Sequence, residues 1–176
     1  MYPVADVVYP SDARSGLDLA LIPDPFEREV EPVPVTTSEA VSPGSTVFAY
    51  GWFSRSPVKY HIEGAFLSGN VFGVNLGSQT DSGHPDVVLP FPVIEGMSGA
   101  PLFLARAEGI GVVGVCYGSR QQRAVASEVI DVREDGKEDY SETTWRIVEL
   151  GLALHINAVA RFLSESGIKD LRWSGF

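Results

Sequence analysis

The sequence predicts an all-β protein with a single helix near its C-terminal end. Short apolar segments recur along most of the 176 residues, and several of them alternate apolar with polar residues. The chain contains 18 glycines and 12 prolines, which favours many turns over long helices. Its hydrophobic content of 44% is enough for a buried core. We therefore expect a folded chain built from short strands.

Composition and charge exclude several classes of partner. The net charge of −10 and the lack of any lysine or arginine run argue against binding to nucleic acid. No apolar run has the length of a membrane span, so we expect no membrane partner. The one cysteine, Cys116, excludes an internal disulfide, and no secretory signal is visible, which together favour a cytoplasmic location. We predict neither a cofactor nor a metal site.

The first 43 residues contain two candidate strands and a linker. Residues 3–9 read as a strand, and an apolar run over residues 17–22 is interrupted by Asp18. This carboxylate either caps a turn at the surface or, if buried, has to be hydrogen-bonded or paired, as when it holds an imidazole. Residues 33–35 are typical of an edge strand because proline cannot donate to a ladder, and residues 36–44 read as a linker.

A second group of short strands follows the linker. Two histidines lie here: His61 on the polar side of an alternating strand, and His84 in a polar loop. We expect the His61 side chain to be exposed to solvent. For His84, a position in the wall of a substrate site is an alternative to a purely structural place in the loop. The strands of this group are predicted at residues 46–51, 59–63, 65–67 and 71–74.

A serine between two glycines carries the strongest chemical signal. Gly96 and Gly99 allow turns that a Cβ would forbid and let the backbone N–H groups around the serine point the same way, as a site for a developing oxyanion requires. A hydroxyl beside such a site is a candidate nucleophile. The alternative is a turn that only reverses the chain. The pattern is not the Gly-x-Ser-x-Gly elbow of α/β-hydrolases, because Ala100 stands at its last position.

The remaining chain predicts two buried strands around a polar excursion. Residues 111–119 and 151–156 read as the strands, the second containing His155, which we expect to be a core or rim residue. Residues 120–149 look like a surface excursion with a hairpin signal at Asp135 and Gly136. Asn157 is predicted to cap a helix over residues 158–166.

Five segments, in the right order, resemble trypsin-like (chymotrypsin-fold) serine proteases of the disulfide-free bacterial and viral type. Residues 17–21 resemble the segment whose aspartate orients the catalytic histidine, and residues 43–51 resemble the entry to the second barrel. Residues 96–101 resemble the Gly-x-Ser-Gly-Gly-Pro nucleophile loop, with Ala100 replacing one glycine. Residues 112–119 resemble the strand that lines the specificity pocket, and residues 151–156 resemble the last strand before the terminal helix.

This resemblance implies a double β-barrel with an incomplete first barrel. Residues 1–43 correspond to part of the N-terminal barrel and the linker, and residues 44–176 to a six-stranded C-terminal barrel with its helix. In the family the catalytic histidine precedes the aspartate, but no histidine precedes Asp18. We therefore expect the histidine in sequence upstream of this chain or on another polypeptide, and we expect another chain or copy to complete the first barrel.

The resemblance further implies a serine endopeptidase that acts on polypeptides. Ser98 is the expected nucleophile, the N–H groups of Gly96 and Ser98 the oxyanion hole, and Asp18 the residue that orients a histidine from outside this chain. No acidic residue lies in residues 91–94, which favours an apolar or small side chain at the substrate position before the scissile bond. The alternative is an inactive protease-fold module that binds peptides or proteins. The expected substrate contacts are Pro92, Val93, Cys116, Tyr117 and Gly118.

Overall fold

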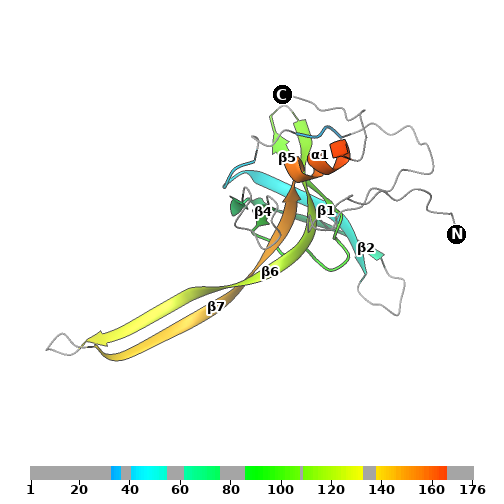
Figure 1. Ribbon diagram of the computed structural model, residues 1–176. Helices are drawn as coiled ribbons and strands as arrows, with labels where there is room; N and C mark the ends of the chain where they lie inside the picture. The colour runs from blue at the N-terminus through cyan, green and yellow to red at the C-terminus, as the bar shows by residue number, and fades with distance from the viewer. Residues whose placement is uncertain are drawn as a thin grey trace.

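The chain forms one antiparallel sheet and one helix, as a computed structural model shows for residues 33–36, 41–54, 62–75, 86–107, 109–132 and 138–165 (Figure 1). The all-β prediction with one helix near the C-terminal end is confirmed. Asp18, His61, His84 and the predicted strand at residues 3–9 lie outside the described residues. The elements are β1 (Thr46–Ser54), β2 (Ile62–Asn70), β3 (Gly73–Asn75), β4 (Asp86–Leu89), β5 (Pro101–Arg106), β6 (Gly109–Val132), β7 (Glu138–His155) and α1 (Ile156–Glu165).

The seven strands follow the order β2-β1-β5-β6-β7-β4-β3, and all neighbours are antiparallel. β2 and β3 are the two edges, so the sheet is open over the described residues, where the resemblance to trypsin-like proteases implies a complete six-stranded barrel. The predicted edge strand at residues 33–35 is reduced to one parallel bridge between Val35 and Val112. Two hydrogen bonds of 2.9 Å, from Thr36 N–H to the Val112 carbonyl and from Val112 N–H to the Pro34 carbonyl, hold it.

The core lies on one side of the curved sheet because small and branched apolar residues alternate along the strands. In β1, Val47 and Ala49 are buried, whereas Tyr50 and Trp52 are exposed. β4 is buried along its whole length, including Asp86 at its first position. The core is formed by Val41, Val47, Ala49, Val71, Val87, Leu89, Phe91, Val93, Met97, Ala100, Leu102, Leu104, Val113, Cys116 and Ala153.

Aromatic rings cover the opposite face of the same strands. Phe48 on β1 stacks on Phe66 of β2 with ring centroids 5.4 Å apart and on Phe103 of β5 at 5.1 Å. Such cross-strand aromatic pairs add to the stability of a sheet beyond the area that they bury. The row ties three neighbouring strands together on the side away from the core.

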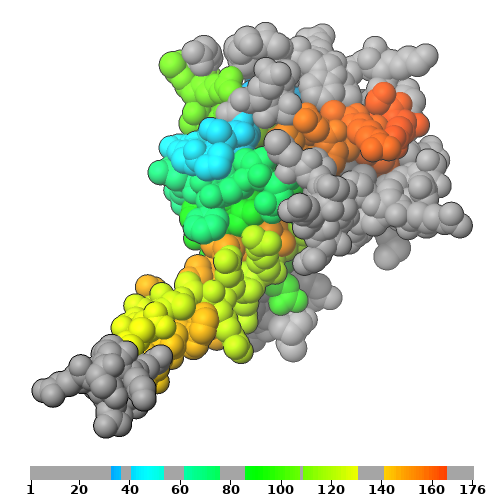
Figure 2. Space-filling view, turned by 60° about the vertical axis from the view of Figure 1, so that its left-hand side comes forward, coloured from blue at the N-terminus to red at the C-terminus, as the bar shows by residue number. Residues whose placement is uncertain are grey.

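The outer parts of β6 and β7 leave the body of the molecule as a two-stranded ribbon (Figures 1 and 2). The strands pair with each other from Arg120 and Leu150 outward to Val132 and Glu138. This confirms the predicted excursion over residues 120–149, although its tip at Asp135 and Gly136 lies outside the described residues.

The helix α1 begins at Ile156, and the prediction that Asn157 caps it is wrong. The cap is His155, whose Nδ1 accepts a hydrogen bond of 3.2 Å from the backbone N–H of Asn157. Ile156, Ala158 and Phe162 form the buried side of the helix. No helix in the described part of the chain is both long and apolar enough to cross a membrane.

His155 is fully buried, with 0% of its surface exposed, which agrees with the core position predicted for it. Because Nδ1 accepts a hydrogen bond, the neutral ring carries its proton on Nε2, and Nε2 has no hydrogen-bond partner in the structure. Burial lowers the pKa of His155 because it disfavours the imidazolium. The folded chain therefore binds this proton less readily than the unfolded chain.

We predict that His155 makes the protein less stable in mild acid. Below the unfolded pKa of about 6.5, the unfolded chain takes up the proton first, so the free energy of unfolding decreases as the pH falls toward the folded pKa. His155→Asn keeps an acceptor for the Asn157 N–H but cannot titrate. We expect a shallower dependence of stability on pH in this variant, measured by urea unfolding at several values between pH 7.5 and 5.

The comparison of pH slopes cancels two unrelated effects. The carboxylates titrate in both proteins, and the space that asparagine leaves in the core costs the same at every pH. Equal slopes for the wild type and the variant would contradict the assignment of this acid sensitivity to His155.

Candidate functional site

The glycine-flanked serine lies in a tight loop between β4 and β5. The loop is closed by two hydrogen bonds of 2.9 Å, from Met97 N–H to the Ile94 carbonyl and from Ala100 N–H to the Met97 carbonyl. Gly96 and Gly99 have φ angles of +95° and +93°, a region that residues with a Cβ rarely adopt. The two glycines are therefore required by the backbone geometry of the loop.

Burial of Met97 places Ser98 on the outside of this loop. The Met97 side chain is 1% exposed and packs against Gly51 of β1, whereas Gly96, Ser98 and Gly99 are exposed. The Ser98 hydroxyl donates a hydrogen bond of 3.0 Å to the Tyr117 carbonyl on β6. A buried methionine thus acts as the anchor of the loop, and the serine that follows it faces solvent.

The loop is fixed to β6 at a bulge. Gly99 N–H donates to the Cys116 carbonyl and Cys116 N–H donates to the Ala100 carbonyl, both at 2.8 Å. The register of β6 against β7 shifts between Cys116 and Gly118, which makes Tyr117 the extra residue. The bulge leaves the Tyr117 carbonyl available for the Ser98 hydroxyl.

The two proposed oxyanion donors lie on either side of the buried Met97. The N–H groups of Met97 and Ala100 form the turn bonds of the loop, and the N–H group of Gly99 bonds to Cys116 on β6. No backbone carbonyl among the described residues accepts a hydrogen bond from the N–H of Gly96 or of Ser98. Both groups are therefore available to a ligand, which an oxyanion hole requires.

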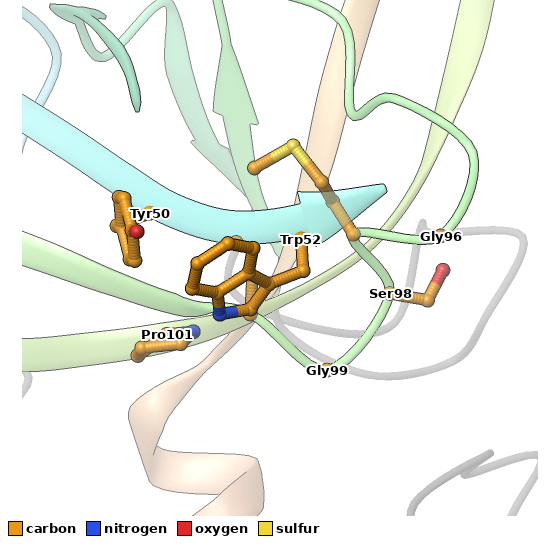
Figure 3. Close-up of a pocket in the computed structure, with 9 residues that line it drawn as sticks. Tyr50, Trp52, Gly96, Ser98, Gly99 and Pro101 are labelled. Carbon is orange, nitrogen blue, oxygen red and sulfur yellow. The ribbon is translucent and has the colours of Figure 1, made fainter. Parts of the chain in front are cut away.

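A groove of about 420 Å³ opens beside the loop (Figure 3). The exposed rings of Tyr50 and Trp52 form one wall, with ring centroids 5.7 Å apart and a near-perpendicular arrangement. Ser98 lies across from them, and its side chain points away from the two rings. The other lining residues are Gly51, Gly96, Met97, Gly99, Ala100 and Pro101, so the groove is suited to an apolar group.

The groove is a feature that the sequence alone did not predict. A signal was present, because aromatic residues occupy alternate positions of β1 between Val47, Ala49 and Gly51, which face the core. An exposed aromatic row marks a binding surface more often than a lone exposed aromatic residue does. The sequence did not show that the serine loop lies next to that row.

The predicted substrate-binding segments are brought together on the other side of the loop. Val93 N–H donates a hydrogen bond of 2.8 Å to the hydroxyl of Ser119. Val93 is buried in the core, whereas Pro92 next to it is exposed. The segments around Val93 and Ser119 therefore contact each other, and neither of them lines the groove.

The three predicted contacts on β6 differ in accessibility. Cys116 is fully buried, both of its backbone groups bond to the loop, and burial raises the pKa of its thiol to about 12. The thiol is therefore neutral and inert near pH 7. Gly118 is half-buried, and Tyr117 is exposed at the bulge. Of the three, Tyr117 has the side chain most accessible to a ligand.

The catalytic base is not found near Ser98 in the described part of the chain. His155 is buried and caps α1, so its imidazole is not available to the loop. Asp18, His61 and His84 lie outside the described residues, and the groove-lining residues include no carboxylate and no histidine. Over the described ranges, no group of three His, Cys, Asp or Glu residues could hold a metal ion.

Comparisons with models of protein families, with curated proteins and with solved structures found no match for this chain. The resemblance to trypsin-like proteases therefore depends on the motifs in the sequence.

We predict that Gly96→Ala destabilises the protein more than Gly99→Ala does. Both substitutions force alanine into the left-handed region, at a cost of roughly 1–3 kcal/mol. At Gly96 the new Cβ would also approach the Cα of Phe53 to 3.3 Å, whereas nothing lies within 4 Å at Gly99. Urea unfolding of the variants measures the difference.

Gly73→Ala is the matched control, because a Cβ at that strand position also meets nothing within 4 Å and the φ angle is not positive. We expect its stability to stay close to that of the wild type. Equal losses at Gly73 and Gly99 would contradict the assignment of strain to the serine loop.

Proposed function

We propose that this chain is part of a trypsin-like serine endopeptidase in which Ser98 is the nucleophile. The observation that carries the proposal is the serine loop itself. Its hydroxyl is exposed on a tight glycine turn and next to an apolar groove, and the two neighbouring N–H groups bond to no backbone carbonyl among the described residues. In this proposal, residues 1–43 belong to a first barrel and residues 44–176 to a second, and the catalytic histidine comes from outside this chain, oriented by Asp18.

The proposed reaction is peptide-bond hydrolysis through an acyl-enzyme. The Ser98 Oγ attacks the peptide carbonyl carbon, its proton moves to the imidazole, and the carbonyl electron pair moves to the oxygen. The N–H groups of Gly96 and Ser98 stabilise that oxyanion. When the C–N bond breaks, the imidazole returns the proton to the leaving amine. Water then hydrolyses the ester by the same route and restores Ser98.

The hydrogen bond from the Ser98 hydroxyl to the Tyr117 carbonyl does not activate the serine, so a separate base is needed. A carbonyl orients the hydroxyl but cannot take its proton, so Ser98 remains a weak nucleophile near pH 7. The oxyanion hole and substrate binding alone could contribute roughly 10³–10⁴-fold over water. We therefore expect this chain by itself to be a poor protease.

The groove supports a preference for apolar side chains next to the scissile bond. Tyr50 and Trp52 offer two exposed rings, and no charged residue lines the groove to select a lysine or arginine. This agrees with the preference expected from residues 91–94, which include no acidic residue.

A second candidate function is an inactive module that binds peptides. It is favoured by one observation, namely that the residues that line the groove include no histidine or carboxylate to activate Ser98. The aromatic groove would then bind an apolar peptide without cleaving it, and the fold would be retained for recognition only.

Labelling with a fluorophosphonate probe tests the enzyme proposal. We expect slow labelling of the wild type at pH 7.5 and faster labelling as imidazole is added, because free imidazole replaces the missing base. Ser98→Ala should abolish the labelling, since it removes the attacking oxygen. The matched control is Ser68→Ala, an exposed serine on β2, which should label like the wild type.

Calorimetric titration with a capped alanine–leucine pentapeptide separates the two candidates. Binding that is lost in Trp52→Ala, together with no labelling at any imidazole concentration, would support the module and overturn the enzyme. Labelling that persists in Ser98→Ala would show that another residue is the nucleophile. Neither binding nor labelling would overturn both proposals.

A further inference from the structure

The ribbon of β6 and β7 is a large exposed feature without an assigned role. We call its residues, 120–132 and 138–150, the arm. The pairing of β6 with β5 ends at Val115 and that of β7 with β4 begins at Gly151, so in the described structure the arm has no third strand. Isolated two-stranded hairpins are marginally stable in water, because one face alone buries too little apolar surface. Additional burial on the arm would stabilise it.

One face of the arm carries a cluster of exposed apolar side chains. Val125 pairs with Trp145, and Ile147 lies two residues from Trp145, so the three side chains are on the same face. Their exposed fractions are 53%, 56% and 64%. Such a patch, close to the middle of the arm, is expected to mark an interaction surface.

Two opposite charges lie on this face at equal distances from its centre. Arg123 is opposite Ile147, one side-chain step toward the body from the Val125–Trp145 pair. Glu128 is opposite Thr143, one step toward the tip, since the bulge between Val125 and Ser127 shifts the register by one residue. Both charges belong to β6. We call these six residues, Arg123, Val125, Glu128, Thr143, Trp145 and Ile147, the arm face.

The other face of the arm is different. There Val129 is opposite Glu142, Ala124 is opposite Arg146 and Ser127 is opposite Thr144. Val129 is 52% exposed, nearly the same as Val125, but it is isolated among polar residues. This face therefore supplies a matched control.

We propose that the arm face binds the arm face of a second copy of this chain, with the two arms antiparallel. A two-fold axis that lies between the faces and crosses the arms at the Val125–Trp145 pair places β6 over β6. It brings Val125 and Trp145 of one copy over the same residues of the other. It also brings Arg123 of each copy over Glu128 of the other, so two attractive charge pairs form at once.

The antiparallel arrangement also suits the shape of the molecule. The arm leaves the body at one end (Figure 2), so antiparallel arms hold the two bodies at opposite ends of the contact. Stacked sheet faces are about 10 Å apart, a distance that tryptophan, arginine and glutamate side chains can span from both sides. In the parallel arrangement the bodies would compete for the same space, and Arg123 would face Ile147 instead of Glu128.

The charge pattern favours a second copy over an anionic partner. The net charge of −10 repels nucleic acid, anionic membranes and also a second copy, so only the local charges of the arm face favour a second copy. The arm face itself pairs one positive with one negative residue about its centre, which is the arrangement that complements itself. Self-complementarity of this kind is what an isologous interface requires.

Sedimentation velocity over a range of protein concentrations tests the proposal. We expect the wild type to dimerise and Trp145→Thr to weaken the dimer by about tenfold or more, because a central aromatic residue dominates such contacts. Val129→Thr, on the other face, should leave the dissociation constant unchanged. A wild type that stays monomeric throughout, or equal losses in the two variants, would overturn the proposal.

A mixing experiment tests the register directly. Arg123→Glu and Glu128→Arg should each dimerise poorly alone, since each places like charges opposite each other twice. An equal mixture of the two variants should form a mixed dimer about as well as the wild type, because both charge pairs are restored across the axis. A mixture that associates no better than its components would overturn the antiparallel register, and restored association would show that both variants are folded.

Discussion

The hydrogen bonds between the serine loop and Cys116 hold together the parts of the structure that matter for function. Gly99 and Ala100 bond with the two backbone groups of Cys116, and the Ser98 hydroxyl bonds with the next carbonyl on β6. These contacts start the pairing of β5 with β6, which places Leu102 and Leu104 in the core. Cys116, which they hold, is buried, and the next residue, Tyr117, is the extra residue of the bulge against β7. The position of Ser98 thus depends on the same few bonds as the middle of the sheet.

The residues of the loop have two kinds of role: some stabilise the loop, and others provide the proposed catalytic groups. Met97 is buried against β1, and this contact fixes the direction of its neighbours. Gly96 and Gly99 provide backbone conformations in which the N–H groups of Gly96 and Ser98 have no backbone acceptor within the described residues. Exposed N–H groups without a backbone acceptor among the described residues can bind a ligand, and glycine is the residue that allows this backbone conformation. Their combination beside an aromatic groove is the physical basis of the proposed catalytic site.

Both faces of the sheet carry apolar side chains: those on the inward face form the core, and those on the outward face lie at the surface. On β1, the residues between the core positions form an aromatic row, and part of this row becomes the wall of the groove. On the arm there is no core at all, so its apolar side chains remain at the surface. The body buries its apolar surface within the chain, whereas in the described structure the apolar side chains of the arm are exposed, which is the basis of the proposed contact with a second copy.

The sequence by itself determined the local features of this protein. The apolar segment of β1 and the polar stretch after Ser119 predicted a strand and an excursion, because these patterns depend on which residues face water. Gly-Met-Ser-Gly predicted a tight turn with an exposed serine, because glycine alone tolerates the backbone that such a turn needs. These inferences required no knowledge of contacts between distant segments.

Only the tertiary structure decided the features that depend on distant partners. The cap of α1 is His155 and not Asn157, because burial positions the imidazole Nδ1 at the first turn of the helix. The sheet stays open over the described residues, because β2 and β3 do not pair with each other. The groove exists because β1 brings Tyr50 and Trp52 beside a loop that follows them by more than 40 positions. Local pattern contains no information on which surfaces meet, so these features come from packing alone.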